Sequence, residues 1–195
     1  MDDSTEWRRE IEVALAAARA GDPRGFDSLF AHFAGPIRAF ARTRGAEDPE
    51  ALANDVLHGV FRGLESFQGD GADFRSWVFR IARNKLIDDH RRRGRRPATA
   101  PAAAAGEPAH ADTYGSLVDR DLLRGPLSTL TDRQREVVVL RFVLDVSIAE
   151  VAAITERPVT AVKAPQPRAL AALRRALAED ERVVSPALDE TITSS

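Results

Sequence analysis

The sequence predicts an all-α protein made of two small helical domains joined by a flexible linker. Apolar residues recur every three or four positions through most of the chain, which is the spacing of amphipathic helices. Ala, Leu, Arg and Glu dominate the composition, aromatic residues make up only 6%, and the alternation typical of strands is scarce. The periodicity stops between residues 97 and 116, so the 195 residues divide into two parts.

Composition and charge narrow the class of protein. The chain has no cysteine, which excludes disulfides and thiolate metal sites. Its start lacks the pattern of a secretory signal, and no apolar run reaches membrane-spanning length, so we expect a soluble, cytoplasmic protein without membrane insertion. The net charge of -2 conceals an uneven distribution of charge, because an acidic stretch (residues 46–73) precedes two basic stretches at residues 74–96 and 157–175. This pattern predicts two contacts with a polyanion and one with a protein surface.

Two amphipathic helices are predicted at the start of the chain. The first covers residues 5–20 and ends at the Gly-Asp-Pro sequence of residues 21–23, because glycine suits a C-cap and proline cannot continue a helix. The second carries apolar residues from Phe26 to Phe40. Gly35-Pro36 should kink or break it, since proline removes an amide and crowds the previous turn.

A third helix is predicted to open at Asp48, as N-cap, with Pro49 at its first position. One face is polar, and the other is an apolar stripe that repeats every four residues: Leu52, Val56, Val60 and Leu64. Residues 69–73 then form a short loop, whose carboxylates we interpret as turn chemistry and not as a metal site.

Residues 74–96 predict a fourth helix with one buried face and nine Arg or Lys residues. Cations at its C-terminal end suit the helix dipole, but five arginines between Arg91 and Arg96 exceed what capping needs. Arginine's planar fork pairs with phosphate oxygens, so a nucleic-acid backbone is the natural counter-surface. The alternative is a solvated basic helix end.

The second domain is predicted to start near residue 117. A first helix is strained or ends near Gly125-Pro126, and capping boxes at residues 131–134 and 147–150 open two more. A short capped helix, a tight turn and a basic segment from Val159 to Leu177 together predict a helix-turn-helix, whose second helix enters the major groove of DNA.

Pro165 and Pro167 interrupt that basic segment. An interior proline costs about 3 kcal/mol in a helix, and it pushes the residue before it toward extended geometry. We therefore expect a break or sharp kink between Lys163 and Arg168, with regular helix resuming through Leu177.

Three blocks carry a more specific pattern. Residues 21–41 read GDPRGFDSLFAHFAGPIRAFA, and the basic helix combines Phe74, Trp77, Ile81-Ala82 and Asn84 with the arginines that follow. The third block, residues 133–154, reads RQREVVVLRFVLDVSIAEVAAI and is followed by RALAALRRAL. In this order they resemble the extracytoplasmic-function (ECF) sigma factors of RNA polymerase, from about Ala20 to Leu177 without the linker.

The resemblance implies a division of the chain and a set of partners. Residues 1–96 would be sigma region 2, 97–116 the linker, 117–180 the region 4 helix-turn-helix domain, and 181–195 a tail. The partners would be core RNA polymerase, promoter DNA and an anti-sigma factor. The resemblance implies no cofactor, no metal and no enzymatic activity.

The resemblance also implies site residues. The third helix would grip core polymerase with Leu52, Asn54, Asp55 and Val56. The loop and the basic helix would read the minus-ten element, the loop by capturing an unstacked base, with Asp70, Phe74, Arg75, Trp77, Arg80, Asn84, Lys85, Arg91, Arg92 and Arg93. The helix-turn-helix would read the minus-thirty-five element with Arg157, Thr160, Lys163, Gln166 and Arg168. Glu156 and Thr160 stand where the family commonly has glycine.

Two other functions are compatible with the sequence. The first is a sigma-like regulator that binds polymerase or an anti-sigma factor but reads the minus-thirty-five element poorly because of Pro165 and Pro167. The second is a metal-dependent nuclease that uses Asp70, Asp73, Asp88 and Asp89, which the lack of convergent ligands disfavours.

Overall fold

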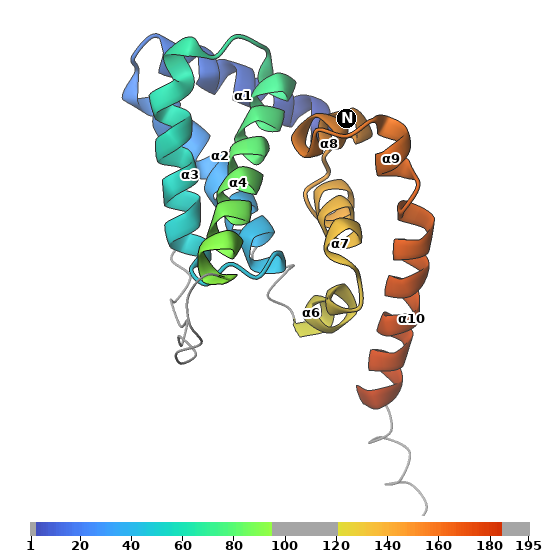
Figure 1. Cartoon of the computed structure of the whole chain (residues 1–195). Coiled ribbons are helices and arrows are strands. Elements are labelled where there is room, and N and C mark those ends of the chain that lie inside the picture. The colour runs from blue at the N-terminus through green and yellow to red at the C-terminus, as the bar shows by residue number, and fades with distance from the viewer. Residues whose placement is uncertain (1–2, 95–120, 185–195) are drawn as a thin grey trace, which may run out of the picture.

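The computed structural model describes residues 3–94 and 121–184, and the predicted linker lies outside them. The N-terminal half consists of α1 (Asp3–Arg19), α2 (Pro23–Thr43), α3 (Pro49–Gly63), the 3-10 turn η1 (Leu64–Ser66) and α4 (Gly71–Gly94). The C-terminal half consists of α6 (Asp121–Ser128), α7 (Asp132–Val138), the π-turn η2 (Val139–Val143), α8 (Ile148–Thr155), α9 (Val159–Lys163) and α10 (Gln166–Val184). The predicted all-α fold with two helical domains is confirmed (Figure 1). The predicted tail from residue 181 lies outside the described residues apart from the end of α10.

Local sequence signals account for most helix boundaries. The Asp48 side chain accepts a hydrogen bond from the Ala51 amide at 2.8 Å, and Pro49 occupies the first position of α3, as predicted. Both predicted capping boxes are present, at the starts of α7 and α8. α6 continues through Gly125-Pro126 and ends at Ser128, close to its predicted end.

Of the kink or break predicted at Gly35-Pro36, the break does not occur. α2 is one helix from Pro23 to Thr43, with Pro36 inside it. Ala34, Gly35 and Ile37 are all buried around this proline. Packing on both sides of Pro36 outweighs the single hydrogen bond that its missing amide removes.

The N-terminal core depends on close helix packing. Gly25 of α2 lies against the backbone of α1, and a Cβ atom there would be 2.3 Å from the amide nitrogen of Ala18. Aromatic rings fill the centre of this half, with edge contacts between Phe33 and Phe74 at 5.5 Å and between Phe40 and Phe79 at 5.9 Å.

The predicted break in the basic segment is confirmed. α9 ends at Lys163, and α10 begins at Gln166. Pro167 lies in the first turn of α10, where the missing amide costs little. The expectation of extended geometry at Ala164 is wrong, because this residue keeps helical dihedral angles (φ -54°, ψ -42°).

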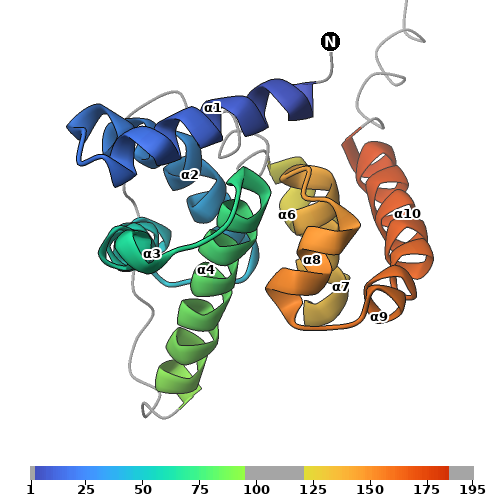
Figure 2. The same ribbon diagram turned by 90° about the horizontal axis from the view of Figure 1, so that it is seen from above.

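The two halves pack directly on each other. α8 lies beside α4 in both ribbon views (Figures 1 and 2), and the buried apolar residues of both halves form one contiguous cluster. Among the residues that the structure describes, no helix is both long and apolar enough to cross a membrane.

Candidate nucleic-acid interface

The start of α4 is fixed by two reciprocal hydrogen bonds. The Asp73 amide donates to Asp70 Oδ1 at 2.9 Å, and the Asp70 amide donates to Asp73 Oδ2 at 3.4 Å. These carboxylates therefore cap the helix, as their interpretation as turn chemistry predicts. Asp88 and Asp89, the other acids of the nuclease alternative, form ion pairs with Arg91, Arg92 and Arg93. No metal-binding group of three or more His, Cys, Asp or Glu residues occurs in the described ranges.

A cluster of aromatic rings follows this cap. Phe74 is fully buried and contacts Phe33 and Phe67, so in this arrangement it supports the fold and offers no surface to a base. Trp77 is half-buried and stacks on Phe67 with ring centroids 5.0 Å apart. A partly exposed aromatic ring beside a basic helix is a platform on which a nucleotide base can stack.

The outer surface of α4 is polar and basic. Arg80 and Asn84 are exposed and lie one helical turn apart. The three arginines of residues 91–93 continue this surface, and their partners Asp88 and Asp89 belong to the same helix. The Arg91–Asp88 pair has both side chains 70% exposed. An exposed pair contributes about 0–1 kcal/mol, so a phosphate group can replace Asp88 as the partner of Arg91.

The predicted polymerase contacts divide into two kinds. Val56 is completely buried and Leu52 is 9% exposed, so both lie in the core of the N-terminal half. Asn54 and Asp55 are exposed on the other side of α3. Asp55 pairs with Lys85 of α4 at 3.3 Å, so these predicted polymerase and minus-ten residues are neighbours.

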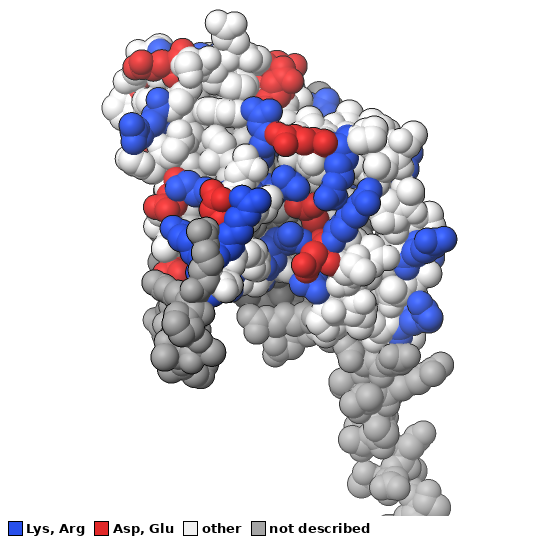
Figure 3. All heavy atoms as spheres, in the orientation of Figure 1, with Lys and Arg blue, Asp and Glu red and all other residues white. Residues whose placement is uncertain are grey.

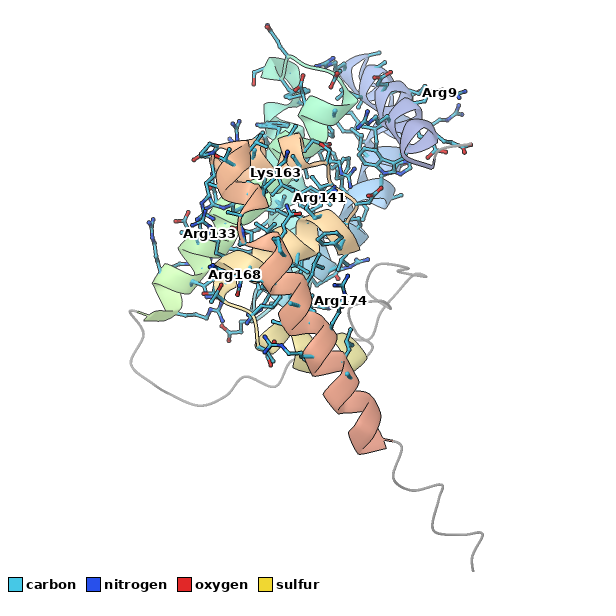
Figure 4. The ribbon with its side chains drawn as sticks, turned by 90° about the vertical axis from the view of Figure 1, so that its right-hand side faces the viewer. Arg9, Arg133, Arg141, Lys163, Arg168 and Arg174 are labelled. Atoms are coloured by element: carbon cyan, nitrogen blue, oxygen red, sulfur yellow. The ribbon has the colours of Figure 1, made fainter. Side chains whose placement is uncertain are left out.

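The helix-turn-helix is formed by α8, a tight turn and α9. Glu156 makes the turn with left-handed backbone angles (φ 55°, ψ 42°), and its amide donates to carbonyls of α8. Thr160, Lys163 and Arg168 are exposed, and Figure 4 shows Lys163 and Arg168 on the side of the molecule that also carries Arg133.

The other two predicted minus-thirty-five residues have partners within the protein. Gln166 Nε2 donates to the Val162 carbonyl at 3.2 Å. Arg157 Nη1 lies 3.8 Å from Glu136 Oε2.

The seam between the halves is rich in charged side chains, which mix over the middle of the face in Figure 3. Arg75 of α4 lies over the Trp7 ring at 4.4 Å and donates a hydrogen bond to the Leu144 carbonyl of the other half. Arg44 at the end of α2 donates to the Asp132 carbonyl at 2.6 Å. Arg83 of α4 donates to Glu136 of α7 at 3.0 Å.

The chain is similar to proteins of one known family. The Sigma-70 region 2 family matches residues 29–96, and the Sigma-70 region 4 family matches residues 120–179. The ECF RNA polymerase sigma factor RpoE of Cereibacter sphaeroides is 30% identical over 176 residues, which are 89% of this chain and 96% of that protein. The chain belongs to the ECF sigma factors.

Other relatives and solved structures agree with this membership. The sigma factor CnrH of Cupriavidus metallidurans is 30% identical over 183 residues, covering 86% of this sigma factor and 94% of CnrH. The structure of CnrH with the cytosolic domain of CnrY matches with a TM-score of 0.63 at 28% identity, over 88% of this chain and 99% of that one. The fold is also that of RpoE from Bartonella quintana, with a TM-score of 0.64, 24% identity, and 80% and 98% of the two chains covered.

Sequence reasoning missed two residues of this sigma factor that the structure brings together, Arg83 and Glu136. They are 53 positions apart and lie in different halves. The available signal was Glu136 itself, a carboxylate that directly precedes the apolar run of residues 137–140. A buried carboxylate requires a charged or hydrogen-bonding partner.

Proposed function

We propose that this sigma factor binds core RNA polymerase and directs it to promoters, with residues 1–96 and 117–180 as its two functional domains. The observation that carries the proposal is that regions 2 and 4 both match, in the family's order, on one chain. The exposed basic surface of α4 and the α8–α9 helix-turn-helix support it. These matches favour a complete sigma factor over a regulator that fails to read the minus-thirty-five element.

The finer assignments follow from exposure. Asn54 and Asp55 would contact core polymerase, while Leu52 and Val56 hold α3 in place. Trp77, Arg80, Asn84 and the arginines of residues 91–93 would contact the minus-ten element, with Phe74 beneath them. Thr160, Lys163 and Arg168 would contact the minus-thirty-five element.

An anti-sigma factor completes the proposed set of partners. The relative CnrH has been solved in complex with the cytosolic domain of CnrY, and this chain matches it over 88% of its length. We place the protein in the cytoplasm, where core polymerase and promoter DNA are found. Sigma factors are not enzymes, and we assign this one no catalytic activity.

Run-off transcription with purified core polymerase tests the proposal. A template library with varied minus-ten and minus-thirty-five sequences should yield transcripts from a defined subset when the protein is added. Polymerase binding without any transcript would contradict promoter direction. Metal-dependent cleavage of the template would instead indicate a nuclease.

A further inference from the structure

A carbonyl of α9 has lost its usual partner. In a continuous helix, the amide of residue 165 would donate to the carbonyl of Ala161, but Pro165 has no amide. Arg133 of α7 takes this place, because its Nη2 donates to the Ala161 carbonyl at 2.9 Å. The next carbonyl, that of Val162, accepts a bond from the Gln166 side chain.

Little else holds α9 in position. The helix has only five residues, its N-cap Pro158 makes no side-chain hydrogen bond, and Val162 is its one buried side chain. The bond from Arg133 therefore ties the end of α9 to α7. The exposed residues Thr160 and Lys163 lie on either side of the carbonyl that Arg133 holds.

We propose that Arg133 is a positioning residue for minus-thirty-five recognition, which rests on the proposed function of α9. It substitutes for the amide that Pro165 removes and so fixes the direction in which α9 presents Thr160 and Lys163. The competing explanation is that Arg133, itself exposed, contacts a DNA phosphate directly.

Pro165 separates the two explanations. Four holoenzymes are compared: the natural protein, Arg133→Ala, Pro165→Leu and the double variant. Each is bound to a duplex with the preferred minus-thirty-five element and to one with that element scrambled. Arg133→Ala should reduce the ratio of affinities for the preferred and the scrambled duplex about tenfold, as loss of a charged hydrogen bond predicts. In the Pro165→Leu background, where leucine supplies the amide, the same change should have less than about a twofold effect.

Arg174→Ala is the matched control, because it removes one positive charge from α10 in the same half. An equal affinity loss from Arg133→Ala on both duplexes and in both backgrounds would identify a phosphate contact and overturn the proposal. Hydrogen exchange in the free chain tests the Arg133–Ala161 hydrogen bond in the absence of DNA. Arg133→Ala should speed exchange at the amides of Val162 and Ala164. Unchanged exchange would overturn the positioning role of Arg133, whether or not the protein has the proposed promoter function.

A second inference comes from Glu136, whose carboxylate lies between two arginines. Glu136 is 3% exposed, and its Oε1 accepts from Arg83 Nε at 3.0 Å across the two halves. Its Oε2 faces Arg157 Nη1 of its own half at 3.8 Å, which is too long for a hydrogen bond. Within the described residues, Arg157 Nη1 has no hydrogen-bond acceptor although it is buried.

We infer that Arg83 and Arg157 compete for Glu136, and that the Arg83–Glu136 pair holds the free chain closed. Separation of the halves removes Arg83 and leaves the carboxylate to Arg157. The closed arrangement also occupies Arg75, which donates to the Leu144 carbonyl. Arg75 is a predicted minus-ten contact, so closure engages a predicted DNA-binding residue of region 2.

Spin labels test this inference, because a chain without cysteine takes labels only where cysteines are introduced. His58→Cys on α3 and Arg174→Cys on α10 report the distance between the halves in the free, full-length protein. Arg83→Gln and Glu136→Gln should each lengthen and broaden the distance distribution. Arg157→Gln should narrow it, since Glu136 is then left to Arg83 alone.

Arg38→Gln is the control, because it removes a pair of the same 3.0 Å length, Arg38 with Glu50, inside the N-terminal half. It should leave the distribution unchanged. If Arg83→Gln keeps native helicity and the natural distance distribution, the pair does not hold the halves together. If Glu136→Gln fails to fold, Arg83→Gln alone decides, because Arg83 is the less buried partner.

Discussion

At the scale of single residues, the backbone of Glu156 is strained. Its positive φ of 55° lies in the left-handed region, which costs a residue with a side chain about 1–2 kcal/mol. Replacing Glu156 with Gly should raise the free energy of unfolding by about 0.5–1 kcal/mol, after the larger entropy loss of glycine is subtracted. Denaturant unfolding monitored by circular dichroism measures the change.

Thr160→Gly is the control for this prediction, because it introduces a glycine four residues further along the chain. Thr160 lies inside α9 and has no positive φ. Glycine there should lower stability by about 0.5–1 kcal/mol. A gain at both positions, or at neither, would contradict the role given to the backbone.

Asp55 is the residue on which polymerase binding is best tested. Its side chain is 70% exposed and pairs with Lys85 at the surface, so Asp55→Arg should change stability by less than about 0.5 kcal/mol. The variant should lose binding to core polymerase in a competition assay. Glu65→Arg, an equal charge change at another exposed position, should compete normally. Early melting of Asp55→Arg would instead make Asp55 a structural residue.

At the scale of elements, we predict that the arginines at the C-terminal end of α4 bind phosphate groups, although they also pair with aspartates of the same helix. Neutralising Arg91, Arg92 and Arg93 together should make the dependence of log K on log salt shallower by about 0.9 for each lost contact, or about 2.7. The measurement uses holoenzyme and promoter DNA at several salt concentrations. An unchanged slope would mean that these arginines form only a solvated helix end, paired with Asp88 and Asp89.

The break between α9 and α10 gives a second prediction for an element. Replacing Pro165 with Leu and Pro167 with His returns two amides, so helicity should rise and binding to a minus-thirty-five duplex should tighten. The gain in stability should fall well short of about 3 kcal/mol per proline, since Pro167 lies in a first turn. Pro36→Ala, in the distant α2, should leave DNA affinity unchanged. Equal affinity in the double variant would mean that the break does not limit recognition.

At the scale of the whole molecule, the sequence predicts what depends on neighbouring residues. The N-cap at Asp48, both capping boxes and the break at Pro165 follow from side chains within four positions of each other. The continuity of α2 through Pro36 was not predicted, because it depends on the burial of the residues around this proline and not on the local sequence. Helix propensities of single residues do not include the packing around a proline.

The residues of the candidate site were also predicted only in part. Its residues were identified by family pattern, but pattern does not separate residues that touch a partner from residues that support them. Val56 and Phe74 match the pattern and are fully buried. The Arg83–Glu136 pair joins residues 53 positions apart, and no periodicity relates them. Such a pair becomes visible only when both halves are placed together.

The position of Trp7 gives the closed arrangement an optical signal. The chain has two tryptophans, and Trp77 stacks on Phe67 inside the N-terminal half. Trp7 lies under Arg75, whose guanidinium is also bonded to the Leu144 carbonyl of the other half. In a Trp77→Phe background, separation of the halves should let water reach the Trp7 indole and shift its fluorescence to longer wavelength. Arg83→Gln or added core polymerase should produce this shift, and an unchanged spectrum would mean that Arg75 stays on Trp7 when the halves part. The emission of the Trp7 indole would then report the opening of the protein.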